Sequence, residues 1–120
     1  MKIVYKIDPE NDANPMGGMH GGRISSLVDS STSLAFFQGK SNISLATIDM
    51  AVTYMKGIDC SKVEEILIES HVDKQGRKIA FLSCNMKNLD ETILYATGRQ
   101  TVAPVTVSGN SALFHKDIET

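Results

Sequence analysis

Hydrophobic and polar residues alternate along several stretches of the chain, as they do in β-strands that bury one face. Short turns rich in Gly, Asn and Asp separate the later stretches, and such turns join antiparallel neighbours. The sequence therefore predicts an antiparallel sheet of five to six strands. The stretches are residues 2–8, 43–55, 63–72, 78–86 and 92–102.

The stretch at residues 43–55 is long enough to assign its two faces. Alternation without interruption places Ile48 and Met50 on a face that packs into the core. The same alternation places Thr47 and Asp49 on the opposite, mostly polar face.

One segment has helical rather than strand spacing. Apolar residues recur at helical intervals between about residues 22 and 38, and Gly39 suits the position that ends a helix. These apolar residues are Ile24, Leu27, Val28, Leu34 and Ala35. Much of the rest of the segment is Ser and Thr, which are poor helix formers but small enough for a sheet to close tightly around them. We expect packing to hold this helix.

A strand, one long helix and then four strands joined by short turns indicate an α+β fold with the helix against one face of the sheet. The 120 residues, 42% of them hydrophobic, match the size of one domain. We expect this domain to cover residues 1–103. Residues 104–120 lose the pattern and are predicted to form a polar C-terminal tail, docked through Leu113 and Phe114.

Charge and cysteine content exclude several function classes. The 12 basic and 14 acidic residues give a net charge of −2, which offers no basic stripe for nucleic acid. Cys60 and Cys84 lack the spacing of a metal site, so we expect free thiols and no metal. Since no apolar run is long enough to span a membrane, we expect a soluble, cytoplasmic chain, with an organelle as the alternative location.

The segment at residues 14–22 is the strongest sign of chemistry. Its sequence is Asn-Pro-Met-Gly-Gly-Met-His-Gly-Gly, and it leads directly into the predicted helix. Glycines let a ligand approach the main chain, and the free N–H groups of a first helical turn attract negative charge. An acyl carbonyl that becomes an oxyanion suits this position. Asp29 follows as the one acid between His20 and Lys40.

These residues resemble a known family, the small hotdog-fold acyl-CoA thioesterases. Their HGGxxxxLxDxxxxxA signature is matched by residues 20–22, Leu27, Asp29 and Ala35. Further similarity at residues 46–55 and 71–81 extends the resemblance to thioesterase superfamily member 2 and the phenylacetate-pathway thioesterases, over residues 2–103. Members of this family commonly begin with a short helix, whereas this sequence reaches its first predicted strand at residue 2.

The resemblance implies a hotdog fold, in which the sheet wraps a central helix and two subunits share their active sites, often within a tetramer. It implies that Asn14 and the backbone N–H of Gly21 hold the thioester carbonyl. Asp29, reaching the site of the second subunit, would activate water, and Thr47 would help to hold that water. His20 would have a supporting role. No cofactor is expected, since coenzyme A is part of the substrate.

Basic residues at one turn add a candidate contact with coenzyme A. Lys74, Arg77 and Lys78 cluster where their charges can meet phosphate groups. Gly22, beside Gly21, is a further candidate for substrate binding.

Two other functions fit parts of the sequence. One is a hotdog dehydratase or hydratase acting on 3-hydroxyacyl thioesters, although those enzymes pair His with an acid at a different spacing. The other is a non-catalytic acyl-CoA-binding module, because a fold can keep a pocket and lose its chemistry. The water-activating set of Asn14, Gly21, Asp29 and Thr47 favours the thioesterase.

Overall fold

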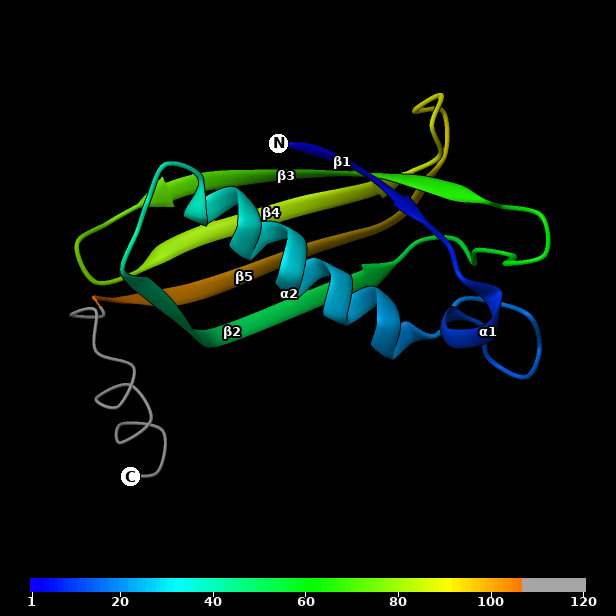
Figure 1. The fold of residues 1–120 in the computed structure, drawn as a ribbon, viewed down its shortest axis with the longest axis horizontal. Helices are drawn as coiled ribbons and strands as arrows, with labels where there is room; N and C mark the ends of the chain where they lie inside the picture. Colours follow the sequence, from blue (N-terminus) through cyan, green and yellow to red (C-terminus); the bar gives the residue numbers. More distant parts are fainter. Residues whose placement is uncertain (107–120) are drawn as a thin grey trace.

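The computed structural model describes residues 1–106, and Figure 1 shows one long helix lying across a five-stranded sheet. This arrangement confirms the predicted fold class. The elements in chain order are β1 (Lys2–Lys6), α1 (Pro9–Asp12), α2 (Gly21–Phe37), β2 (Ile43–Tyr54), β3 (Glu65–Gln75), β4 (Ala80–Lys87) and β5 (Leu94–Thr106).

The strands lie in the order β1-β3-β4-β5-β2, and every neighbouring pair is antiparallel. Among residues 1–106, β2 therefore pairs only with β5, and no strand lies along its other edge. β5 continues to Thr106, past the predicted domain boundary at residue 103. The rest of the predicted tail, with Leu113 and Phe114, lies outside the described residues.

The middle of α2 packs very closely against β5. Val28 is fully buried, and a Cβ atom added to Gly98 would lie 2.5 Å from Val28 Cγ1. Real Cβ atoms do not approach other atoms so closely, so only glycine fits at position 98 unless the helix moves away. Ile66, Ile68 and Met86 extend the core along the same face of the sheet.

The sheet-facing side of α2 is only partly apolar. Its buried residues are Ile24, Val28, Ser31, Thr32 and Phe36. The small side chains of Ser31 and Thr32 allow the tight packing that the sequence predicted. Leu34, which the helical spacing grouped with the apolar residues, is 53% exposed in the single chain.

A β-bulge in β2 overturns the predicted assignment of its faces. The register passes from Thr47 opposite Val102 directly to Asp49 opposite Thr101, which leaves Ile48 as the extra residue. Val102 belongs to the buried core, so Thr47 lies on the helix-facing side of the sheet. The prediction that Thr47 shares the polar face with Asp49 is therefore wrong, because it assumed unbroken alternation.

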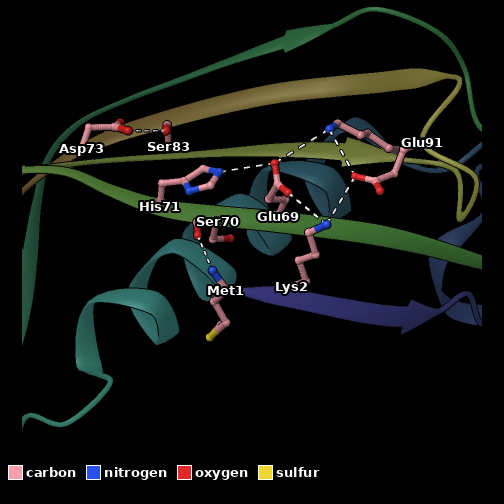
Figure 2. Close-up of polar contacts among 9 residues, drawn as sticks. Met1, Lys2, Glu69, Ser70, His71, Asp73, Ser83 and Glu91 are labelled. Atoms are coloured by element: carbon pink, nitrogen blue, oxygen red, sulfur yellow. Dashed lines mark hydrogen bonds and ion pairs between the residues drawn. The ribbon is translucent and has the colours of Figure 1, made fainter.

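The face of the sheet away from α2 carries a group of ion pairs, shown in Figure 2. Lys2 lies 3.5 Å from Glu69 and 3.6 Å from Glu91, and Lys87 lies within 3.8 Å of both acids. His71 approaches Glu69 to 3.4 Å. The hydrogen bond from His71, together with the charges of Lys87 and Lys2, holds the pKa of Glu69 below its ordinary value of 4.5.

We predict that Gly98→Ala lowers the free energy of unfolding by about 1–3 kcal/mol, because the new methyl group forces Val28 and its helix outward. Urea unfolding followed by circular dichroism measures the loss. Gly57→Ala is the matched control, since an added Cβ at that residue meets no atom of the described part of the chain within 4 Å. Equal stability of the two variants would contradict the close contact.

We also predict a pH-dependent effect of Glu69→Gln. A lowered pKa in the folded state stabilises the fold above the ordinary value of 4.5, and this gain is lost as the pH falls through the folded value. The variant is therefore less stable than the wild type at neutral pH, by a small amount because the pairs are partly exposed. The difference should vanish once the pH is below the folded-state pKa of Glu69. A difference that is the same in acid and at neutral pH would argue against the ion pairs.

Candidate active site

The glycine-rich segment forms a closed loop ahead of α2. Asn14 closes it, because its Oδ1 accepts hydrogen bonds from the backbone N–H groups of Met16 (2.9 Å) and Gly18 (3.1 Å). With Oδ1 engaged in this way, the carboxamide orientation is fixed and the NH₂ group is left as a donor. The residues that the structure describes provide no hydrogen-bond partner for that NH₂ group.

α2 begins at Gly21 with its first backbone donors open. His20 occupies the N-cap, but its side chain makes no capping hydrogen bond. Within residues 1–106, the N–H groups of Gly21 and Gly22 have no acceptor, and both glycines are exposed. The helix dipole places partial positive charge at this end. The start of α2 therefore presents open donors of the kind that stabilise a negatively charged oxygen.

Tyr54, which sequence reasoning did not single out, covers the first turn of α2 from β2. Its hydroxyl donates to the carbonyl of Gly21 at 2.9 Å and lies 2.8 Å from Ser25 Oγ. Because its one hydrogen goes to Gly21, Ser25 is the donor in the second bond. These contacts fix the orientation of the peptide that follows Gly21. A tyrosine at the end of a strand gave no signal that it would reach this helix.

A buried carboxylate behind the loop also escaped sequence reasoning. Asp12 is fully buried in α1. Its Oδ1 lies 2.7 Å from Arg23 Nε, and its Oδ2 accepts from the Tyr5 hydroxyl at 2.9 Å. Burial raises the pKa of Tyr5, and the hydrogen bond to Asp12 raises this pKa further. The carbonyl of Asp12 accepts the backbone N–H of His20 at 2.8 Å. Asp12 thus joins β1, the loop and the first turn of α2.

Asp29 and Thr47 lie together, away from the loop. Both are exposed, and both contact the side chain of Gln100 on β5. Asp29 follows Gly21 by eight residues, which places it about 12 Å further along the helix axis at 1.5 Å per residue. A single chain therefore places Asn14 in the loop that leads into Gly21, and places Asp29 and Thr47 together further along α2.

The basic residues of the β3–β4 turn lie at yet another place. Lys74, Arg77 and Lys78 are exposed. Figure 1 shows their turn at the end of the sheet where α2 finishes, whereas α1 and the glycine-rich loop lie at the other end. One chain does not bring these residues near Gly22.

Comparison with known proteins identifies the family. The sequence profile of the thioesterase superfamily matches residues 16–95. Human acyl-coenzyme A thioesterase 13 is 35% identical over 101 residues, which cover 83% of this chain and 71% of the human protein. The mouse protein of the same name is 36% identical over 92 residues, covering 77% of this chain and 64% of its own length. The chain therefore belongs to the thioesterase superfamily, as the HGG motif indicated.

Solved structures agree with this assignment. The crystal structure of zebrafish thioesterase superfamily member 2 has a TM-score of 0.75 and 34% identity, with 85% of this chain and 73% of that chain covered. Mouse thioesterase superfamily member 2 has a TM-score of 0.71 and 32% identity, with 87% and 80% covered. These structures confirm the hotdog thioesterase architecture. No helix within residues 1–106 is long and apolar enough to cross a membrane.

We predict that Asp12→Ala lowers the free energy of unfolding by about 1–3 kcal/mol, because it leaves the Tyr5 hydroxyl and Arg23 without their buried acceptor. Asp59→Ala is the control, since Asp59 is exposed and its side chain bonds only Ser61 among the described residues. Thermal and urea unfolding compare the two variants. A loss for Asp12→Ala no larger than that of the control would show that Asp12 does not hold the loop.

Proposed function

We propose that the protein is an acyl-CoA thioesterase, which hydrolyses the thioester to a free carboxylic acid and coenzyme A at a site shared by two copies of the chain. Its relatives named acyl-coenzyme A thioesterase 13 support this reaction. The observation that carries the proposal is the pair of complementary half-sites: open donors at the start of α2, and a carboxylate beside a hydroxyl further along it.

The helix geometry supports a shared site. The separation of about 12 Å along α2 between Gly21 and Asp29 is too long for one water molecule to touch Asp29 and also attack a carbonyl held at Gly21. A second copy related by two-fold symmetry brings its own Asp29 to the first copy's glycine loop. By the same symmetry, Asp29 of the first copy reaches the glycine loop of the second.

The edge of β2 that no strand of residues 1–106 covers supports this pairing. An unpaired strand edge is a template for another strand, and proteins that leave one open normally cover or protect it. β2 exposes Ile48 (58%), Met50 (38%) and Tyr54 (52%), so it has apolar surface to bury. We propose that β2 pairs with β2 of a second copy, in a homodimer or in a homotetramer built from such dimers.

The reaction then needs four steps from these residues. The Asn14 amide and the Gly21 N–H donate to the thioester carbonyl oxygen. Asp29 of the other copy takes a proton from water, held also by Thr47, as the water oxygen attacks the carbonyl carbon. The donors stabilise the resulting oxyanion, an effect worth about a hundredfold to a thousandfold per donor. The C–S bond then breaks, and the proton passes from Asp29 to the sulfur of coenzyme A.

The remaining predicted residues keep secondary roles in the proposal. The Gly22 N–H adds to the positive field at the start of α2, and His20 lines the approach to the carbonyl. Lys74, Arg77 and Lys78 would bind the phosphates of coenzyme A carried by a neighbouring copy. The buried free thiols of Cys60 and Cys84 support a reducing compartment such as the cytoplasm.

We predict that Asp29→Ala lowers kcat at least about a hundredfold, because the water loses its general base. Thiol release from acetyl, medium-chain, long-chain and phenylacetyl-type CoA esters measures turnover at equal protein concentration. Asp90→Ala is the control, since Asp90 is an exposed acid in the turn between β4 and β5. This control should match the wild type.

Four outcomes would contradict the proposal. Unchanged turnover in Asp29→Ala would remove Asp29 from the chemistry. Binding of acyl-CoA without turnover by the wild type would favour the non-catalytic module, and hydration of an unsaturated thioester would favour the hydratase. A monomer in size-exclusion chromatography with light scattering would exclude the shared site.

A further inference from the structure

Gln100 is a polar side chain that is only 2% exposed, in the centre of the helix-facing side of β5. Its carboxamide reaches both α2 and β2. The nitrogen Nε2 lies 2.6 Å from Thr32 Oγ1 and 3.3 Å from both Asp29 Oδ1 and the Asp29 carbonyl. The oxygen Oε1 accepts a hydrogen bond from Thr47 Oγ1 at 3.0 Å.

The surroundings fix which end of the carboxamide faces the helix. The Thr32 hydroxyl already donates its one hydrogen to the carbonyl of Val28 at 2.7 Å. Thr32 can therefore only accept from Gln100, as can the carbonyl and the ionised carboxylate of Asp29. The NH₂ group must point to α2, and the oxygen must point to Thr47.

This orientation decides the hydrogen bonding of Thr47. Its hydroxyl hydrogen is directed to Gln100, so the Thr47 oxygen can only accept from a water molecule. Asp29, when ionised, also only accepts. A water molecule between them must donate both of its hydrogens to the protein, which leaves its lone pairs free to attack.

The β-bulge at Ile48 makes this contact attainable. Without it, strand alternation would turn Thr47 to the opposite face of the sheet, away from Gln100. The bulge therefore places the Thr47 hydroxyl group on the helix-facing side of the sheet, where the buried amide of Gln100 accepts its hydrogen.

We infer that Gln100 is a positioning residue for hydrolysis, which holds Asp29 and sets Thr47 as a hydrogen-bond acceptor so that the attacking water is oriented. This inference rests on the proposed function. It assigns Gln100 no contact with the substrate.

Gln100→Leu, which has a similar volume but no polar group, tests the inference. We expect kcat to fall about tenfold to a hundredfold through loss of orientation, with KM within about twofold of the wild type. In the Asp29→Ala background, the same substitution should lower kcat by less than about threefold, because the group that it positions is already gone. Ser70→Ala is the control, since Ser70 is a buried polar residue on β3 whose hydroxyl has no partner among residues 1–106.

Gln100→Glu provides a second variant if the leucine disturbs folding. It keeps the acceptor for Thr47 but places a carboxylate beside Asp29. A like charge at this distance favours protonation, so the acid limb of the pH–kcat profile should move to higher pH. Merely lower stability would not move that limb.

The outcomes separate the inference from the proposed function. Loss of activity in Asp29→Ala together with wild-type kcat in Gln100→Leu overturns the inference alone. An equal fall of kcat for Gln100→Leu with and without Asp29 also overturns it, as does an unmoved acid limb in Gln100→Glu. Unchanged turnover in Asp29→Ala overturns the proposed function itself.

Discussion

The contact between Val28 and Gly98 is the constraint on which the rest of this structure depends. A Cβ atom at position 98 would lie 2.5 Å from Val28 Cγ1, so the absence of a side chain sets how deeply α2 sits against β5. Well-packed interiors transmit such a constraint because they have few voids to absorb a shift. Ser31 and Thr32, both buried one turn further on, keep the same close spacing along the helix. Bulkier residues there would lift α2 from the sheet.

The depth and rotation of α2 then decide what each of its residues can do. With Val28 buried, the adjacent Asp29 lies at the margin of the helix–sheet contact, within 3.3 Å of Gln100 and exposed on its other side. At the start of the helix, Asp12 and Tyr54 contact the first turn from two sides. Its backbone N–H groups therefore keep a fixed direction. Such preorganised donors stabilise developing charge without reorganising during the reaction. Rigid packing in the middle of α2 thus supports both half-sites.

The sequence predicted the strands, the long helix and the family because each leaves a local or linear signal. Period-two alternation, helical spacing and the HGG motif can all be read along the chain. The face of the sheet on which Thr47 lies could not be predicted in this way, because one extra residue in β2 reverses the alternation. No residue type marks such a bulge in the sequence. Asp12 and Gln100 were missed for a different reason. Their importance comes from burial and from partners far away in sequence, and an isolated acid or amide shows neither.

A mixed-dimer experiment tests the shared site most directly. Asn14→Asp removes the amide donors while keeping an acceptor that closes the loop, and Asp29→Ala removes the base, so each homodimer should be inactive. If each site takes one residue from either copy, unfolding and refolding an equal mixture gives heterodimers with one intact site, and about a quarter of wild-type activity should return. A mixture that stays as inactive as the separate variants would contradict the shared site and place the whole reaction within one chain.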